Sequence, residues 1–327
     1  MPKSTFSAII LALVVAAHGC TICTSHAQDF PSKTVRIIVG FAPGGSNDLV
    51  ARLIAPKLSE YFDKQVIIEN RPGANAIIGT DLVAKASPDG HTLGLVGVSN
   101  LILNPLIYPK VPYAVSDFRG LTTVGMTHQV ITVHPSLGTK TLKEFVTLAK
   151  ARPGQLNFAS SGFGGLKHLL VEMLNDVAKI QIRQIAYKGG SLALTDVISG
   201  QVHGVALDIA APYPHIKQGK LRALAVTSES RASLLPEVPT AVEQGVNVVS
   251  VNWFAVVAPV KTPRHIVERL HSDLAKASKA PDIKDRFSAV GVEPISNETP
   301  EAFASFVLEE YSRWSKIVKQ SKIVDQV

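Results

Sequence analysis

The sequence predicts an α/β fold in two lobes, in which helices cover mainly parallel sheets. Short apolar runs of strand length alternate with segments of helical periodicity along most of the chain, which is typical of βαβ units. With 327 residues, 46% of them apolar and 18% charged, the chain can bury two cores and is too apolar to be disordered. No flexible linker and no internal repeat interrupts the pattern. Two lobes would therefore be joined by more than one crossing of the chain.

The N-terminal part of the chain alternates strands and helices. Apolar residues recur at helical spacing from Leu49 to Leu58, and Pro88 ends a second, shorter helical segment. The apolar runs between them are typical of strands. The expected order is a strand at 35–41, a helix at 47–62, a strand at 66–69, a helix at 81–86 and a strand at 92–98.

The alternation resumes after a loop-rich section that ends near residue 129. Thr141 and Glu144 form a capping box at the start of a helix, and Pro153 and Gly154 end it. Strands are expected at 130–134, 156–159, 180–186, 205–208 and 221–227, and helices from 141, at 167–177 and at 192–198.

The last quarter of the chain is predicted to be mostly helical. Thr262 and Thr299 are each followed by proline, a pattern typical of an N-cap with proline at the first helical position. Helices are therefore expected from 262 and from 299, with another at 281–290 that Gly291 ends. The strands at 130–134 and 254–258 are the expected crossings between the lobes.

The N-terminus has the three parts of an export signal. Lys3 supplies the positive charge, residues 6–17 are apolar and too few to cross a bilayer, and 25–27 form a small-x-small cleavage site. We expect cleavage near Ala27. A buried N-terminal helix is disfavoured because the segment has no amphipathic stripe. Lipidation at Cys20 is a second alternative, although the residues before it make a poor lipobox.

Charge and composition argue against nucleic acid, metal and cofactor binding, although a positive patch could still form in three dimensions. Removal of Lys3 with the signal would lower the formal charge from +7 to +6, and no run of Lys and Arg exceeds two residues. A nucleic-acid-binding protein normally gathers its positive charge into a patch, so no nucleic acid is expected. Cleavage would also remove both cysteines, and no H-E-x-x-H occurs. Neither a metal nor a cofactor is expected.

Three segments place glycine and a small hydroxyl residue between a strand and a helix. They are residues 43–48, 160–165 and 188–191. Backbone N–H groups at a helix start are unpaired and carry partial positive charge, and glycine lets a ligand approach them closely. Such loops can hold a carboxylate or phosphate without arginine. Each loop could equally use glycine and serine for turn geometry alone, so the three together suggest an anion site without defining one.

Catalysis is not expected. Ser161, His168 and Asp208 could be drawn as a triad, but no G-x-S-x-G surrounds the serine. His168 is interpreted as a packed or capping helix residue. Trp253 and Trp314 are interpreted as core or interdomain packing. A secreted hydrolase therefore remains only the third hypothesis.

A series of segments resembles one family. It appears in order across almost the whole mature chain, which makes the resemblance specific. The segments are 41–48 (FAPGGSND), 69–74 (ENRPGA), 84–93 (AKASPDGHTL), 160–164 (SSGFG) with His168 and Leu169, 187–189 (YKG), 219–226 (GKLRALAV), 236–240 (PEVPT) and 253–254 (WF). They are similar to those of the tripartite tricarboxylate transporter receptors, also called Bug proteins.

The resemblance implies a monomeric periplasmic solute-binding protein of type II-like architecture. It implies one lobe from 28–129 plus 255–327 and another from 130–254, closing over a small organic carboxylate that is delivered to a membrane permease. One carboxyl group would be held by the first two loops through backbone groups, small hydroxyls and water. Asp208 matches an acidic position that reads the far end. The implied ligand-binding residues are Phe41, Ala42, Gly44, Gly45, Ser46, Asp48, Ser160, Ser161, Gly164, Gly165 and Asp208.

One departure from the family concerns the second loop. Family members usually carry Thr or Ser where this chain has Gly165, so one hydroxyl for the carboxylate is missing. Loss of such a charge-assisted bond lowers affinity about 10- to 100-fold unless water or the Gly165 N–H replaces it. The runner-up function is a periplasmic sensor module that presents its ligand state to a signalling partner.

Overall fold

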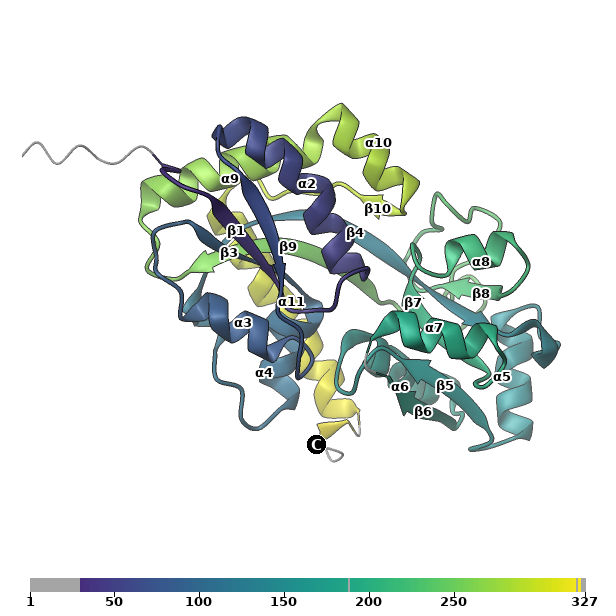
Figure 1. Cartoon of the computed structure of the whole chain (residues 1–327). Helices are drawn as coiled ribbons and strands as arrows, with labels where there is room; N and C mark the ends of the chain where they lie inside the picture. Colours follow the sequence, from purple (N-terminus) through teal and green to yellow (C-terminus); the bar gives the residue numbers. More distant parts are fainter. Residues whose placement is uncertain (1–29, 188, 322, 325–327) are drawn as a thin grey trace, which may run out of the picture.

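The protein has two lobes that lie side by side (Figure 1). The computed structural model describes residues 30–187, 189–321, 323 and 324. The predicted export signal over 1–27, its Cys20 and Lys188 of the third loop lie outside the described residues. Among the residues described, no helix is both long enough and apolar enough to cross a membrane.

The first lobe is built on a mixed sheet, so the prediction of mainly parallel sheets is wrong for it. The parallel strands β2, β1 and β3 lie on one side, and β3 pairs antiparallel with β9, which pairs antiparallel with β4. The short β10 also pairs with β4. The bounds are β1 Val35–Val39, β2 Val66–Asn70, β3 Thr92–Gly97, β4 Phe118–Val133, β9 Val251–Pro259 and β10 Val292–Glu293.

The long strand β4 continues into the second lobe. It pairs with β9 up to His128, and from Gln129 onward it pairs with β7, while its residues from Val130 pair with β8. β7 continues the sheet through parallel pairing to β5 and then β6. The predicted division of the lobes after residue 129 falls at this change of partner and stays a prediction. The bounds are β5 Leu156–Ser160, β6 Ile182–Ala186, β7 Gly204–Asp208 and β8 Arg222–Val226.

Helices cover both faces of each sheet because their apolar stripes are buried against the strands. In the first lobe, one apolar cluster joins the sheet to α2, α9 and α10, and another joins it to the 98–107 segment and α11. In the second lobe, separate clusters lie under α5 with α6 and under α7. The bounds are α2 Ser46–Phe62, α3 Ile77–Ala84, α4 Asn104–Ile107, α5 Leu142–Ala151, α6 Leu166–Ala178, α7 Gly190–Ile198, α8 Tyr213–Lys217, α9 Arg264–Lys279, α10 Pro281–Ala289 and α11 Pro300–Gln320.

Most predicted elements are confirmed, with four corrections. The helix expected at 81–86 is α3, which begins at Ile77, directly after three residues in the left-handed conformation. The strand expected at 130–134 is only the end of the 16-residue β4. The preceding section expected to be loop-rich contains its first part, together with a π-helix at Val98–Leu103 and α4. Thr262 does not cap α9, since its hydroxyl donates to the Pro259 carbonyl at 2.8 Å and Pro263 is the N-cap.

Candidate ligand-binding site

The first predicted loop connects β1 to α2 and is held by a buried carboxylate. Asp48, in the first turn of α2, accepts hydrogen bonds from the Gly44 N–H at 3.0 Å, from Arg52 Nε at 2.9 Å and from Asn70 Nδ2 at 2.9 Å. Asn70 Nδ2 also donates to the Phe41 carbonyl at 3.0 Å. Asp48 and Asn70 therefore fix the path of the backbone that leads into α2.

The charge on Asp48 is stabilised within the loop. Burial alone raises the pKa of Asp48, but hydrogen bonds from Arg52, the Gly44 N–H and Asn70 outweigh it, and the pKa lies below its ordinary value. Both carboxylate oxygens are engaged by donors of the chain itself. These bonds indicate that Asp48 shapes the loop. Its predicted direct contact with a ligand stays untested.

The backbone at the start of α2 is open. Gly45 is the N-cap, with an extended conformation and no side-chain capping bond. Gly44 has φ +85°, a left-handed conformation that favours glycine. Phe41, Gly45 and Ser46 are half-buried, whereas Ala42 and Gly44 are exposed. The first N–H groups of the helix thus lack a side-chain acceptor from the N-cap.

The second predicted loop connects β5 to α6 and has the same construction. Gly165 is an extended N-cap without a side-chain capping bond, and Gly164 has φ +68°. The hydroxyl of the buried Ser160 donates to the Gly162 carbonyl at 3.3 Å, so it serves the loop itself. Ser161 is half-buried. Two helix starts of the predicted kind are therefore present.

His168 supports this second loop as a neutral side chain. Its Nδ1 accepts a hydrogen bond from the Gly164 N–H at 3.2 Å, and the Phe163 ring packs edge-on against it at 4.6 Å between centroids. Burial lowers the pKa of His168 to about 4, so the imidazole is uncharged at neutral pH. The interpretation of His168 as a packed helix residue agrees with these contacts. Asp208 accepts hydrogen bonds from Lys167 and Asn252, and His168 Nδ1 accepts one from the Gly164 N–H, so the triad that could be drawn from the sequence is not formed among the described residues.

Residues of the 75–108 region tie the start of α6 to the first sheet. The Leu166 N–H donates to Ser99 Oγ at 3.1 Å, and Tyr108 Oη donates to the Phe163 carbonyl at 2.8 Å. A methyl group added at Gly165 would lie 3.2 Å from Asn75 Oδ1 and 3.6 Å from Ser99 Oγ. Sequence reasoning missed Asn75, Ser99 and Tyr108, because their roles depend on contacts with a distant segment.

Asp208, at the carboxyl end of β7, lies on the other side of the same region. It is 4% exposed, and Lys167 Nζ lies 2.8 Å from one of its oxygens and donates to the other at 3.0 Å. Asn252 Nδ2 of β9 donates to Asp208 at 3.2 Å. A methyl group added at Gly97 would lie 3.3 Å from Asn252 Oδ1 and 3.9 Å from Asn47 Nδ2. Gly97 and Asn252 therefore lie between the start of α2 and Asp208.

Two buried amide donors in this region have no acceptor among the described residues. They are Asn47 Nδ2, at the start of α2, and Gln129 Nε2, on β4. Gln129 lies directly opposite Asp208 in the β4–β7 pair, so their side chains share one face of the sheet. Its Oε1 accepts from Ser250 Oγ at 2.7 Å. Buried donors without a partner are costly, and an acceptor ligand would satisfy them.

The third predicted loop lies beside the second. Gly189 is the N-cap of α7, and a methyl group added at Gly190 would lie 3.9 Å from Ser161 Cβ and 3.3 Å from Leu207 Cδ2. The starts of α6 and α7 are therefore neighbours at the ends of β5 and β7. Within the described part of the chain, no group of three or more His, Cys, Asp or Glu residues could hold a metal ion.

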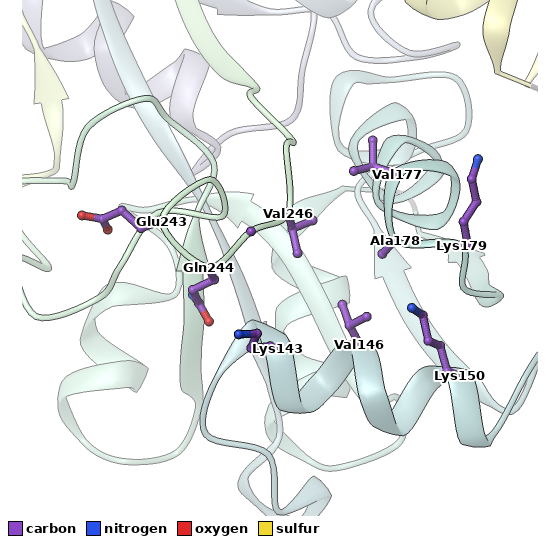
Figure 2. Close-up of a pocket in the computed structure, with 10 residues that line it drawn as sticks. Lys143, Val146, Lys150, Val177, Ala178, Lys179, Glu243, Gln244 and Val246 are labelled. Carbon is purple, nitrogen blue, oxygen red and sulfur yellow. The ribbon is translucent and has the colours of Figure 1, made fainter.

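A surface pocket of about 520 Å³ lies elsewhere, at the C-terminal end of α6 (Figure 2). It is lined by α5, by the end of α6 and by the segment 243–246. Lys143, Lys150 and Lys179 are among the residues that line it, as labelled in Figure 2. None of the predicted site residues lines this pocket.

Comparison with known proteins gives consistent matches. Residues 50–323 match the family described as "Tripartite tricarboxylate transporter family receptor". Protein BugT of Bordetella pertussis is 34% identical over 315 residues, covering 95% of this chain and 96% of BugT. The structure of Rpa4515 of R. palustris with adipate is 31% identical, with a TM-score of 0.85 over 89% of this chain and 98% of that chain. MatC (Rpa3494) from Rhodopseudomonas palustris with bound malate is 29% identical, with a TM-score of 0.82 over 88% of this chain and 100% of that chain.

Proposed function

The chain belongs to the tripartite tricarboxylate transporter receptor family, and from this membership we propose that it captures a small organic carboxylate in the periplasm and delivers it to a tripartite tricarboxylate-type permease in the membrane. Similar structures carry adipate and malate, both of which are dicarboxylates. Their chemistry supports a carboxylate as the ligand class here.

The observation that carries the proposal is the unsatisfied donor chemistry around the predicted loops. The helices α2 and α6 start at glycine N-caps without side-chain capping bonds, and Asn47 Nδ2 and Gln129 Nε2 lack an acceptor among the described residues. Donors of this kind favour an anion with several acceptor oxygens. The acidic side chains nearby, Asp48 and Asp208, are each paired with a cation, so they repel an anion less.

In the proposed complex, the first two loops hold one carboxyl group of the ligand. The first loop contributes Phe41, Ala42, Gly44, Gly45 and Ser46, and the second contributes Ser160, Ser161, Gly164 and Gly165. Asp48 acts in the same site through the Gly44 N–H that it orients. Asp208 acts at the far end of the ligand, where it is paired with Lys167. Backbone N–H groups supply most of the donors, which is effective when closure of the lobes excludes water.

Ser99 can replace the hydroxyl that is missing at Gly165. Its Oγ lies 3.6 Å from the position of a methyl group added at Gly165. Ser99 Oγ accepts from the Leu166 N–H, and its own hydroxyl proton remains available to donate to a ligand. The receptor would thus retain a hydroxyl donor at this place, supplied by the first lobe.

The proposal includes export and processing. Cleavage near Ala27 would leave a monomeric periplasmic receptor whose two lobes comprise 28–129 plus 255–327 and 130–254. Mass spectrometry of the protein purified from expressing cells tests this directly. An N-terminus at Gln28 agrees with it, whereas a diacylglycerol-modified Cys20 would replace it with a lipoprotein.

A thermal-shift screen tests ligand capture. A ligand that binds only the folded state raises the apparent melting temperature as its concentration exceeds the dissociation constant. We expect a shift with one class of carboxylate and none with the matching uncharged diamides. Equal shifts with acids and diamides, or shifts only with neutral or cationic solutes, would contradict the proposal. Delivery is tested by uptake of that acid in cells that carry the permease subunits with and without this protein.

A further inference from the structure

A buried ion pair adjoins the proposed site. Lys167 belongs to the first turn of α6, and its Nζ lies 2.8 and 3.0 Å from the two carboxylate oxygens of Asp208. The side chains are 13% and 5% exposed. Most ion pairs among the described residues are more exposed, as Lys179 with Asp176 illustrates at 77% and 68%. The Lys167–Asp208 pair therefore sets the charge of this region with little screening by solvent.

Pairing with Lys167 changes which charged group of a ligand Asp208 attracts. An unpaired buried carboxylate attracts a cationic group of a ligand, such as an ammonium, and repels a second carboxylate. In this protein Lys167 cancels that charge, and Asn252 Nδ2 adds a further hydrogen bond to the carboxylate. Asp208 Oδ1 accepts no hydrogen bond among the described residues, but Lys167 Nζ lies 2.8 Å from it. A ligand ammonium that approached this oxygen would therefore be repelled by the charge of Lys167.

Lys167 also retains a donor of its own. An ammonium group has three N–H donors, and the two oxygens of Asp208 engage at most two of them at these distances. The remaining N–H can donate to an acceptor of the ligand. Asp208 thus acts as a positioning residue for Lys167, and the far end of the site presents a cation held in place by an anion.

We propose that Lys167 is a specificity-determining residue that makes this site select a dicarboxylate over an ω-amino acid of the same length. The inference rests on the proposed function, because it takes one carboxylate to be held at the starts of α2 and α6. It adds that the second carboxylate accepts a hydrogen bond from Lys167.

Calorimetric titration with three matched pairs of acids tests the proposal. The pairs are succinate with β-alanine, glutarate with 4-aminobutyrate, and adipate with 5-aminovalerate. In each pair an ammonium replaces one carboxylate at similar length. The wild-type protein should bind at least one dicarboxylate about 10-fold or more tightly than its partner. Lys167→Met should weaken that dicarboxylate about 10- to 100-fold, the effect of one charge-assisted hydrogen bond, and shift the preference toward the amino acid. Lys179→Met, which removes the exposed lysine directly after the same helix, should change neither the affinity for the dicarboxylate nor the preference.

A second variant covers the case in which Lys167→Met does not fold. Asp208→Asn leaves Lys167 charged, so preference for the dicarboxylate should persist or increase. The inference is overturned if the wild-type protein prefers the amino acid, if Lys167→Met leaves the ratio of affinities unchanged, or if Asp208→Asn shifts that ratio toward the amino acid. Failure of the wild-type protein to bind any carboxylate overturns the proposed function as well. A dicarboxylate bound with the same ratio in both lysine variants overturns only the role of Lys167.

Discussion

Gly45 is a position where substitution should separate ligand binding from folding. It is the N-cap of α2 with φ −82°, a conformation open to any residue, and an added methyl group would meet only the Ala42 carbonyl oxygen, at 3.7 Å. Gly45→Val therefore leaves the backbone unstrained and costs about 1 kcal/mol or less at the cap. Its side chain would, however, cover the N–H groups that hold the carboxylate. Loss of two charge-assisted bonds at about 1.5–3 kcal/mol each lowers affinity by more than about 100-fold.

The assay combines calorimetric titration of the bound acid with urea denaturation. Thr299→Val is the matched control, because Thr299 caps a different helix, α11, by accepting from the Ala302 N–H at 3.0 Å. This control should lose about 1 kcal/mol of stability and keep its affinity. Gly45→Val should instead lose affinity for the acid and keep most of its stability. Unchanged affinity in Gly45→Val, with stability retained, would refute the role assigned to the start of α2.

Three further substitutions test separate contacts. Asp48→Asn should lower the free energy of unfolding by about 1.5–3 kcal/mol at pH 7. Because the pKa of Asp48 is lower in the folded state than its ordinary value of 3.8, the difference from wild type should be complete above pH 3.8 and should shrink as the pH falls through the folded pKa. Glu310→Ala should cost about 2–6 kcal/mol in urea, since two buried indole N–H groups lose their acceptor, whereas exposed Glu309→Ala should be neutral. Gly164→Ala should lower the free energy of unfolding by at least about 1–2 kcal/mol, because Gly164 has a left-handed φ of +68°. The added methyl group would also clash with the Tyr108 side chain. Combining it with Tyr108→Ala should relieve only this clash, and a double-mutant cycle measures that part.

Local periodicity was sufficient to predict most helices and strands. The apolar stripe of α2 and the cap at Thr299 act within a few residues, so they can be identified without knowledge of the fold. β4 was largely missed because Gly120, Gly125 and several threonines interrupt its apolar pattern. These glycines are required by tertiary contacts, since a methyl group at Gly120 would overlap the Phe303 ring. Such a constraint has no local signal.

The same distinction separates the predictable from the unpredictable parts of the site. Glycine and serine at a strand-to-helix junction mark the loops at 41–48 and 160–165, and both occupy helix starts in the structure. Lys167 has no such mark, because a lysine in a helix normally faces solvent. Its role follows from the position of Asp208, 41 residues later in the sequence. Asn252 likewise belongs to β9 and reaches Asp208 only in the folded chain.

In the proposed complex, the two ends of the ligand are recognised in different ways, and the contacts around α6 give the reason. Leu166 and Leu169 pack in one apolar cluster with Val98 and Trp253, and Tyr108 Oη donates to the Phe163 carbonyl at 2.8 Å. The start of α6 is therefore held against the sheet that also positions α2, which lowers the cost of ordering the subsite for the first carboxylate.

This arrangement gives Tyr108→Phe a distinct expected result. Loss of the Tyr108 hydrogen bond, at about 0.5–1.5 kcal/mol, loosens the subsite that every carboxylate ligand shares. Affinity for all acids of a panel should then fall by the same factor, about 2- to 10-fold. Lys167 acts instead on the group that differs between ligands, so its removal should change their ratio. Calorimetric titration of Tyr108→Phe with succinate and β-alanine distinguishes the two effects, and an altered ratio in this variant would contradict a shared subsite at the start of α6.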